Sequence, residues 1–354
     1  MAAMESTGPY WKPLFNIFEL EGIDAIVVNA QHMKAVPGRK TDVKDAEWIA
    51  NLLQHGLLRA SFIPNKEQRD LRDLLRYRKS KVEERARDLN RLQKFLEGAN
   101  VKLAGILSDI NGVTGKRLLS LIVSDKDVNL ESVAECRDPS VKASAEELLL
   151  SAEGIISQLQ RELIRATLEN IMELGNQIDW LTKLVEKHMC GAYADAAKAL
   201  DELPGIGIAS AQVIVGEIGI DMKRFPNEHH LSSWAGLCPG NNESAGKTKS
   251  GRTNQANKVL KTTLTQCAHI ACRDKKSFFY AQYQRLVVRR GKKKAIVAVA
   301  HSMLIAIYHV LSGKTFKDLG SDYYCQFNTD KKISSYLKQL SKLGWKPPAS
   351  VIAG

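Results

Sequence analysis

The sequence of 354 residues predicts an α/β segment at the N-terminus, followed by a mainly α-helical remainder. Residues 9–22 have a helical apolar spacing that stops at Gly22, the β-branched run 24–29 follows, and another helix is expected from about Asp42 to His55. This alternation of strand and helix favours a parallel sheet. Further along the chain, apolar residues recur every three or four positions over long stretches, which predicts long helices.

Two acidic residues stand where the helix after the β-branched run begins. The segment TDVKDAEW, residues 41–48, places Asp42 and Asp45 three positions apart. One interpretation is helix capping, because carboxylates in the first turn complement the helix dipole. The other is a divalent metal site, since hard cations prefer carboxylate oxygens that converge from one side. Glu5 precedes the first helix, so it shares the sheet edge with Asp42 if both follow strands.

Two regions have the pattern of long helices, residues 67–98 and roughly 143–189. Helices of this length and mixed charge are typical of hairpins or coiled coils that set the geometry of an oligomer. The first region is rich in arginine, but its interleaved acidic residues favour a solvated face over phosphate contact.

The positive charge of the chain is concentrated in one segment. The formal net charge is +12, and residues 223–294 contain sixteen Lys and Arg against three acidic residues, while the remainder is close to neutral. A concentrated positive surface indicates a polyanion, and nucleic acid held through its phosphates is the partner that we expect. At the end of this segment the candidate contacts are Arg289, Arg290, Lys292, Lys293 and Lys294.

A glycine-rich turn precedes the basic segment. In the run ELPGIGIASAQVIVGEIG, residues 202–219, Gly205 and Gly207 are followed by small and apolar residues, which is similar to a helix-hairpin-helix. The glycines of such a turn let backbone N–H groups approach a DNA phosphate. The alternative is a packing unit with a glycine corner, and the basic residues just downstream favour DNA.

Small, polar and basic residues are densest in residues 236–258. A nucleotide-binding P-loop is excluded, because Gly240 lies one residue too far before the Gly246-Lys247-Thr248 run and no clear β run precedes it. A flexible loop with a serine among cations suits attack on a phosphodiester, in which the cations stabilise the oxyanions. The alternative is a basic loop whose serines only bond phosphates. The cations that we expect to contact nucleic acid here are Lys247, Lys249, Arg252 and Lys258.

The remaining composition excludes other classes of protein. Six cysteines are scattered with no CxxC pair, which argues against a zinc site and fits reduced thiols in a cytosol. The charge-free run 295–311 is short for a membrane span and contains His301 and His309, so we expect a buried helix entered from the basic stretch RRGKKK. With no signal-peptide pattern at the N-terminus, we expect a cytoplasmic protein that does not bind membranes.

Four segments together resemble a known family in their order and approximate spacing: MESTGPYW, KTDVKDAEWIANLLQHGLL, LPGIGIASAQVIVGEIG and WAGLCPGNNESAGKTKSGRTNQANK. The resemblance is to the DEDD-plus-serine transposases of the insertion-sequence-110 family, closest to its 1111 branch, and it covers most of residues 4–315. It implies a RuvC-like (RNase H-like) N-terminal domain with four acidic metal ligands, a helical coiled coil, and a C-terminal domain with a nucleophilic serine.

The resemblance also implies roles for individual residues. Glu5 matches the family's Glu, Asp42 and Asp45 match its last two Asp, and Ser244 matches its catalytic serine. On this basis the three acids are interpreted as ligands of Mg²⁺, while Asp42 can still cap its helix. The family uses a structured non-coding RNA, encoded beside the gene, to pair with donor and target DNA. The expected partners are therefore DNA, a guide RNA and further copies of the chain in a dimer or tetramer, in a bacterial nucleoid.

The sequence departs from the family at its beginning. The family's first Asp lies on an initial strand well before the Glu, whereas this sequence starts at MAAMESTG. Asp24 starts a strand, so it is expected at the opposite edge of the sheet from Glu5. A truncated site with three of its four carboxylates predicts that this chain binds nucleic acid and self-associates but cleaves poorly.

We expect a transposase that cuts and rejoins DNA with a carboxylate-bound metal and a serine nucleophile, guided by RNA. Two alternatives stay open: a RuvC-like, structure-selective nuclease that uses the carboxylates and water, and an inactive nucleic-acid-binding remnant. The expected domains are a partial RuvC-like domain (1–66), long helices or a coiled coil (67–195), a serine transposase domain with the helix-hairpin-helix-like turn (196–315) and a C-terminal tail (316–354).

Overall fold

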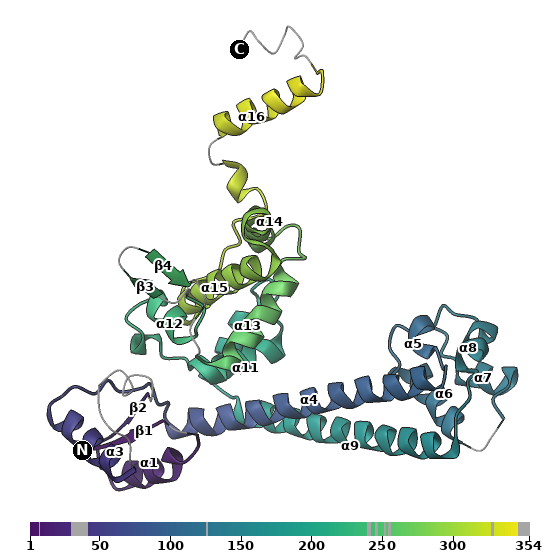
Figure 1. The fold of residues 1–354 in the computed structure, drawn as a ribbon, viewed down its shortest axis with the longest axis horizontal. Coiled ribbons are helices and arrows are strands. Elements are labelled where there is room, and N and C mark those ends of the chain that lie inside the picture. The colour runs from purple at the N-terminus through teal and green to yellow at the C-terminus, as the bar shows by residue number, and fades with distance from the viewer. Residues whose placement is uncertain are drawn as a thin grey trace. The chain divides into compact units, whose positions relative to one another are not determined.

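A computed structural model of the chain is shown in Figure 1. It divides into two compact units, Met1–Arg69 and Asp70–Gly354, which are described separately. The structure describes the backbone of all residues except 7, 30–41, 125–126, 239–241, 245–246, 251–252, 254–255, 327–328 and 346–354. The side chains of 42–45, 242–244, 247–250, 325–326 and 329–332 also lie outside the description.

The first unit contains a parallel pair of strands, as predicted. Strands β1 (Ala2–Glu5) and β2 (Ala25–Val28) pair in the register Ala2 with Ala25 through Glu5 with Val28. Helix α1 (Trp11–Leu20) connects them and packs on β2, and α3 (Asp42–Gln54) packs on β1. The α/β prediction is therefore confirmed for this segment, whereas two described strands do not define a RuvC-like fold, which stays a prediction.

Burial explains why these short strands form. Val27 and Val28 are fully buried, and their β-branched side chains favour extended backbone. A further extended segment lies along β2, where the Ser61 N–H donates to the Val27 carbonyl at 2.7 Å. At the end of the unit, the Arg69 guanidinium binds Glu19 of α1 at 2.5 Å and holds the pKa of that carboxyl below its usual value.

Two long helices in the second unit run antiparallel to each other (Figure 1). They are α4 (Lys66–Gly98) and α9 (Gln158–His188), and the Asn170 side chain of α9 donates to Asp88 of α4. The two predicted long helices thus form an antiparallel pair within one chain, and a role in oligomer geometry stays a prediction.

The expected helical region from 143 to 189 is interrupted. Helix α8 ends at Ala152 and α9 begins at Gln158, with Ser157 as its N-cap. The break lies at Gly154, where an added Cβ would be 2.4 Å from the Ala99 carbonyl oxygen. The close approach of these two backbone segments therefore decides the break, which local apolar spacing could not predict.

Short helices between α4 and α9 enclose a small hydrophobic core, here called the tip core. Its buried residues include Leu103, Leu118, Leu148 and Ile164. The helices are α5 (Leu103–Ile106), α6 (Val113–Val123), α7 (Leu130–Cys136) and α8 (Ala145–Ala152).

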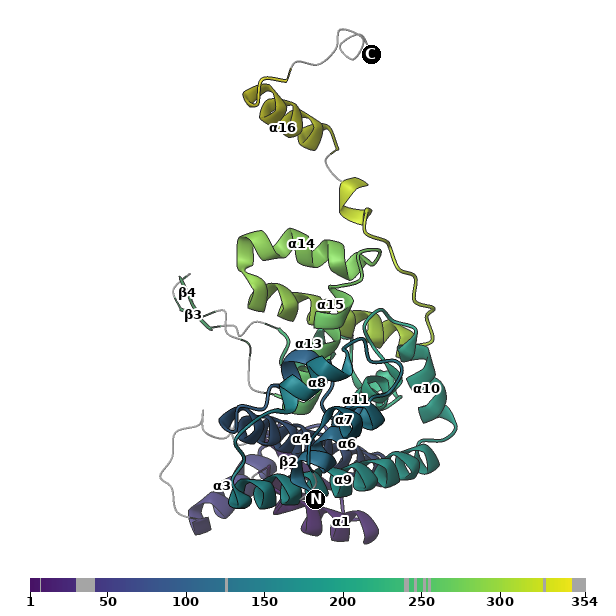
Figure 2. The same cartoon turned by 90° about the vertical axis from the view of Figure 1, so that its right-hand side faces the viewer.

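A larger hydrophobic core, here called the serine core, is formed by the segments after α9 together with the adjoining parts of α4 and α9. Its helices α14 (Phe278–Arg290) and α15 (Lys292–Leu311) lie side by side and are joined at Gly291, which has a φ of +77° (Figures 1 and 2). The other elements between α9 and α14 are α10 (Ala192–Asp201), α11 (Ile208–Ile218), η1 (Met222–Arg224), α12 (Glu228–Trp234), β3 (Asn242–Ser244), β4 (Lys247–Ser250) and α13 (Lys258–Ala271).

Helix α15 confirms the predicted apolar helix. In the described part of the chain it is the one helix whose length and composition would suffice to cross a membrane. It packs against α10, α12, α13 and α14, and its side chains Val299, Met303 and Ile307 are fully buried. Seven of its side chains are buried in these contacts, and most of the others after Lys294 are half-buried.

The predicted C-terminal tail contains further helical structure. A 3₁₀ turn, η2 (Tyr323–Gln326), places Tyr323 and Tyr324 against Phe278 of α14, with ring centroids 5.2 and 5.5 Å apart. Helix α16 (Thr329–Lys342) follows, and its described side chains are exposed.

Candidate functional site

Glu5 is the last residue of β1 and lies at the carboxyl end of the parallel pair. It is half-buried and stands opposite Val28, and the next residue, Ser6, donates its N–H to the Val28 carbonyl at 2.9 Å. Asp24 lies just before β2 begins, at the amino end of the parallel pair. There the Ala2 N–H donates to the Asp24 carbonyl at 2.8 Å. A four-residue strand spans about 10 Å. The expectation that Asp24 and Glu5 lie at opposite edges is therefore confirmed.

Helix α3 begins at Asp42, as predicted, and packs on the strand that ends in Glu5. The side chains of Asp42 and Asp45 lie outside the described residues, so both the capping and the metal interpretation stay predictions. Among the residues that are described, no group of three His, Cys, Asp or Glu could hold a metal ion. As a donor set, three carboxylates fit a hard cation such as Mg²⁺.

The segment that carries Ser244 is an antiparallel hairpin, not the flexible loop that we expected from the sequence. Strands β3 and β4 pair with Ser244 opposite Lys247, so Ala245 and Gly246 connect them. The expectation was wrong because these strands are polar on both faces, and no alternation of apolar residues marks them as strands. The side chains of the hairpin, including Lys247 and Lys249, lie outside the described residues, as does Arg252.

Two other serines of this region have different positions. Ser250 pairs with Asn242, at the end of the hairpin away from the connection. Ser277 is 1% exposed, and its hydroxyl caps α14 by accepting from the N–H groups of Phe279 and Tyr280. A buried cap is not available for chemistry, so Ser277 has a structural role.

The hairpin is attached to the serine core at both ends, but in different ways. Before it, Leu237 is buried among apolar side chains. After it, Asn257 caps α13 by accepting the Leu260 N–H at 3.1 Å, and Lys261 of the same helix donates to the Thr253 hydroxyl at 2.5 Å. The first attachment is apolar and the second is polar.

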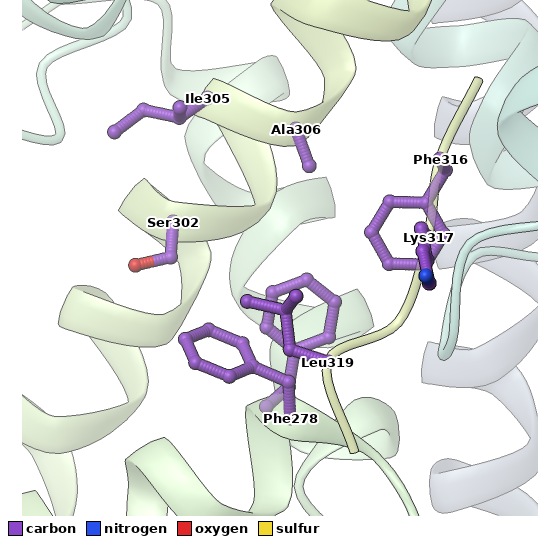
Figure 3. A pocket seen from close by; sticks show the side chains of 8 residues that line it. Phe278, Ser302, Ile305, Ala306, Phe316, Lys317 and Leu319 are labelled. Atoms are coloured by element: carbon purple, nitrogen blue, oxygen red, sulfur yellow. The ribbon is translucent and has the colours of Figure 1, made fainter. Parts of the chain in front are cut away.

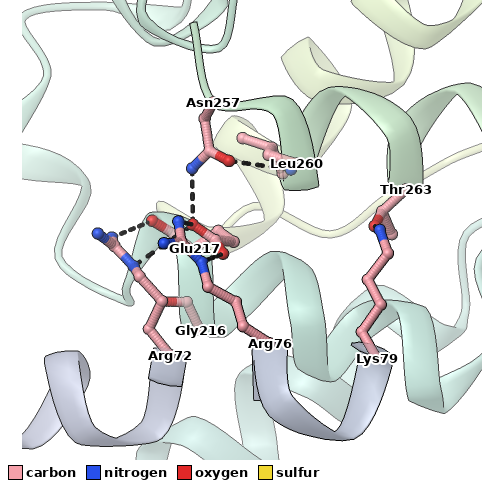
Figure 4. A network of polar contacts seen from close by, with 8 residues as sticks. All are labelled: Arg72, Arg76, Lys79, Gly216, Glu217, Asn257, Leu260 and Thr263. Carbon is pink, nitrogen blue, oxygen red and sulfur yellow. Dashed lines mark hydrogen bonds and ion pairs between the residues drawn. The ribbon is translucent and has the colours of Figure 1, made fainter. Parts of the chain in front are cut away.

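A buried acidic residue, Glu217 at the end of α11, organises the second attachment (Figure 4). It is 2% exposed and accepts two hydrogen bonds from Arg76 of α4, at 2.6 and 2.8 Å. The Asn257 side-chain amide donates to the same carboxylate at 2.6 Å. Arg72 donates to the Glu217 backbone carbonyl at 2.6 Å. Three separate segments of the chain therefore meet at one carboxylate.

Charge balance makes this buried group tolerable. Burial by itself lowers the pKa of Arg76, but its hydrogen bond to Glu217 and the negative charge there raise that pKa above its ordinary value. For Arg72 burial has the larger effect and lowers the pKa, with Glu217 opposing it. A bidentate, charge-assisted pair of this kind is strong and directional. Beside it, Lys79 donates to Thr263 of α13 at 3.2 Å, so α4 holds α13 at a second point (Figure 4).

Glu217 and its two arginine partners are functional-site neighbours that the sequence pattern did not predict. One signal was present, because Glu217 is the single charged residue in the apolar run of α11. A lone acid in a buried helix requires a cation, and arginines recur at the i, i+4 positions 72 and 76 of α4. The spacing of 141 residues between Arg76 and Glu217 hides their pairing.

The glycine turn before α11 is shaped by packing. Gly205 has a φ of +82°, and an added Cβ would be 2.5 Å from the Ala271 nitrogen of α13. Gly207 is exposed, is the N-cap of α11, and has open space around its Cα. The structure therefore gives Gly205 a packing role, and phosphate contact at Gly205 and Gly207 stays a prediction.

The predicted cationic contacts that the structure describes are exposed. Lys258 opens α13 beside the hairpin, and the residues at the junction of α14 and α15 project into solvent. The exposed residues at the junction are Arg289, Arg290, Lys292, Lys293 and Lys294. Their exposure is compatible with phosphate binding and equally with a solvated face.

An apolar cavity of about 250 Å³ lies between α14, α15 and the segment 316–319 (Figure 3). Phe278, Phe316 and Leu319 line it. Its one hydroxyl, of Ser302, already donates to the Ala298 carbonyl and accepts from Gln282 at 2.7 Å. Apart from this hydroxyl and the side chain of Lys317, the lining is apolar and offers no acidic or nucleophilic group with a free partner position.

Comparison with known proteins identifies the class as insertion-sequence transposases. Residues 1–101 match the DEDD transposase family of IS110 elements, and residues 197–284 match the transposase family IS116/IS110/IS902. The first match contains Glu5, Asp42 and Asp45, and the second contains Ser244 and Glu217. The chain belongs to the IS110 family of transposases, which confirms the resemblance found in the sequence.

Individual relatives agree with this assignment. The chain is 25% identical to the transposase for insertion sequence element IS1111A of Coxiella burnetii, over 82% of this chain and 72% of that protein. It is 26% identical to the putative transposase y4rJ of Sinorhizobium fredii, over 84% and 73% of the two chains. It is also 23% identical to a probable family 20 transposase of Pseudomonas aeruginosa, over 89% and 85%.

Proposed function

We propose that this transposase cuts and rejoins DNA with a serine nucleophile, Ser244, together with a divalent metal held by Glu5, Asp42 and Asp45. The observation that carries the serine assignment is the hairpin, in which Ser244 stands directly opposite Lys247 next to the two-residue connection. A serine at the end of a hairpin can reach a DNA strand, and the neighbouring cations stabilise negative charge on the phosphate.

In the proposed reaction the Ser244 hydroxyl loses its proton and its Oγ attacks a DNA phosphorus. The Oγ–phosphorus bond forms, the bond from phosphorus to one deoxyribose oxygen breaks, and that oxygen leaves as a hydroxyl after it takes up a proton. Because one phosphate ester replaces another, a deoxyribose hydroxyl of a second strand can reverse the attack and rejoin the DNA. The positively charged residues Lys247, Lys249 and Arg252 would stabilise the oxyanions.

The carboxylates have a separate task. Glu5 lies at the carboxyl end of β1, and α3, which begins at Asp42, packs on this strand. Glu5, Asp42 and Asp45 would hold Mg²⁺, which would supply positive charge to stabilise the phosphate during cleavage. In the sequence Asp42 and Asp45 stand three positions apart, the spacing of one helix face.

The substrate is DNA bound through its phosphates, with a structured RNA that pairs with the donor and target sequences. The proposed nucleic-acid contacts are the exposed cations at the α14–α15 junction, Lys258, and the glycine turn of Gly205 and Gly207. A cytoplasmic location at the nucleoid and assembly as a dimer or tetramer belong to the same proposal.

A trapped covalent adduct tests the serine. The full chain is incubated with Mg²⁺ and a plasmid that carries the element with its flanking non-coding sequence, whose transcript is supplied. We expect a protein–DNA adduct that mass spectrometry locates on Ser244, and that is absent in Ser244→Ala and retained in Ser250→Ala. A label on Ser250 contradicts the assignment. Cleavage that survives Ser244→Ala indicates the carboxylate-and-water nuclease, and binding without cleavage by any variant indicates the inactive remnant.

A further inference from the structure

The polar attachment after the serine hairpin differs from a simple helix cap. Asn257 uses both atoms of its side-chain amide: the oxygen accepts from the Leu260 N–H, and the nitrogen donates to Glu217 at 2.6 Å. The cap alone needs only the oxygen. The second bond adds a connection from the start of α13 to the end of α11.

Glu217 in turn is held by α4. Arg76 binds both carboxylate oxygens, so the carboxylate cannot rotate toward another partner without breaking two charge-assisted bonds. The backbone of α11 also packs on a side chain of α4 here, because an added Cβ on Gly216 would be 2.3 Å from the Cδ1 of Leu75. The carboxylate that receives the Asn257 amide is therefore held by two hydrogen bonds from α4.

We propose that Arg76, Glu217 and Asn257 form a latch that positions the serine hairpin for attack on DNA, and that these three are positioning residues. The inference rests on the proposed serine chemistry. The hairpin has two ends: Leu237 holds the first by burial, and the latch with Lys261 and Thr253 holds the second. At Thr253 and Asn257, in the chain that follows the second strand, the bonds are directional and fix orientation as well as distance.

The latch can be opened without removing a buried charge. Changing Arg76 removes the bidentate partner of the buried Glu217 carboxylate, and changing Glu217 removes the partner of both Arg72 and Arg76, so either change confuses positioning with folding. In Asn257→Ser, the hydroxyl still caps α13 but is too short to reach Glu217, and Glu217 keeps Arg76. The matched control is Asn227→Ser: Asn227 caps α12 by accepting the His229 and His230 N–H groups at 3.0 Å, with no bond to Glu217.

Three measurements on the full chain test the proposal: amide hydrogen exchange, thermal unfolding, and formation of the Ser244 adduct on the plasmid described above. In Asn257→Ser we expect exchange in residues 242–257 to accelerate about tenfold, because the latch must open before these amides exchange. We expect the adduct to form about tenfold more slowly with unchanged DNA affinity, because misplacement lowers the rate of attack. The thermal midpoint should match that of Asn227→Ser.

Equal exchange and equal adduct rates in Asn257→Ser and Asn227→Ser would overturn the latch. A slower adduct together with an equally lowered midpoint and faster exchange throughout the serine core would also overturn it, because the residue would then act on stability. If the wild-type protein cleaves without a serine adduct, the proposed function fails, and the positioning of Ser244 fails with it. The exchange measurement then decides separately whether the three residues hold the hairpin.

Discussion

The first unit and the serine core differ greatly in the number of buried apolar side chains that support their proposed chemistry. In the described residues of the first unit, the buried aliphatic side chains are Met4, Val27, Val28 and Leu52. The serine core buries thirty apolar residues. Each fully buried side chain contributes about 1.5–3 kcal/mol. Substitutions of the carboxylates are therefore expected to lower the rate of cleavage. Substitutions of residues packed in the serine core are expected to lower the free energy of unfolding first.

The largest effect is expected at Asp42, and it decides between the two interpretations of that residue. Asn caps a helix as well as Asp but does not supply a metal-binding carboxylate. If the metal proposal is right, Asp42→Asn lowers Mg²⁺-dependent cleavage by about 100-fold or more, with an unchanged midpoint of thermal unfolding. The control is Glu47→Gln on the exposed part of the same helix. Wild-type cleavage by Asp42→Asn would leave capping as the role of Asp42.

In the serine core the largest effect is expected at Gly205. An alanine there must adopt a φ of +82° and place its Cβ 2.5 Å from the backbone of α13. We expect Gly205→Ala to lower the free energy of unfolding by about 2–4 kcal/mol, measured by chemical denaturation. Gly207→Ala is the matched control, because its φ of −98° suits alanine and its Cα has open space. Equal losses in both variants would contradict the packing role.

A smaller effect, on binding and not on stability, is expected at the α14–α15 junction. Removing the charges of residues 289, 290 and 292–294 should flatten the slope of log K against log salt by about 0.9 for each DNA phosphate that these side chains no longer neutralise. The residues are exposed, so the thermal midpoint should stay unchanged. Removal of Lys116, Arg117 and Lys142, exposed cations of the α5–α8 region, serves as the control. An unchanged slope would identify the junction as a solvated face.

The smallest effect concerns His301 on α15. Burial, and to a lesser degree His229, lower the pKa of His301 below its usual value. A lowered pKa means that the folded state binds the proton less readily than the unfolded state, so stability is complete above about pH 6.5 and falls as the pH drops toward the folded pKa. Between pH 7 and pH 5, we expect the free energy of unfolding to fall less in His301→Gln than in the wild type. The difference between the two decreases should be about 1 kcal/mol or less. The control is His269→Gln at an exposed position, and an equal flattening there would contradict the assignment.

Local patterns in the sequence determined much of the architecture. The strand at Ala25–Val28, the start of α3 at Asp42 and the buried helix α15 all agree with their predictions. These elements are predictable because side-chain spacing and β-branching act within a few residues of each other. The order of the four motifs was sufficient to identify the family, since it depends on residue types and not on contacts.

Only the tertiary structure decided the remainder. The break of the second long helical region at Gly154 depends on the approach of the Ala99 carbonyl, and the hairpin of Ser244 depends on backbone pairing between polar strands. Likewise, Glu217 meets Arg76 across 141 residues. Backbone packing and buried ion pairs join residues that are distant in the chain, and no spacing rule records which distant residues meet. The sequence therefore identified the residues of the proposed chemistry, while tertiary packing determined what surrounds Ser244.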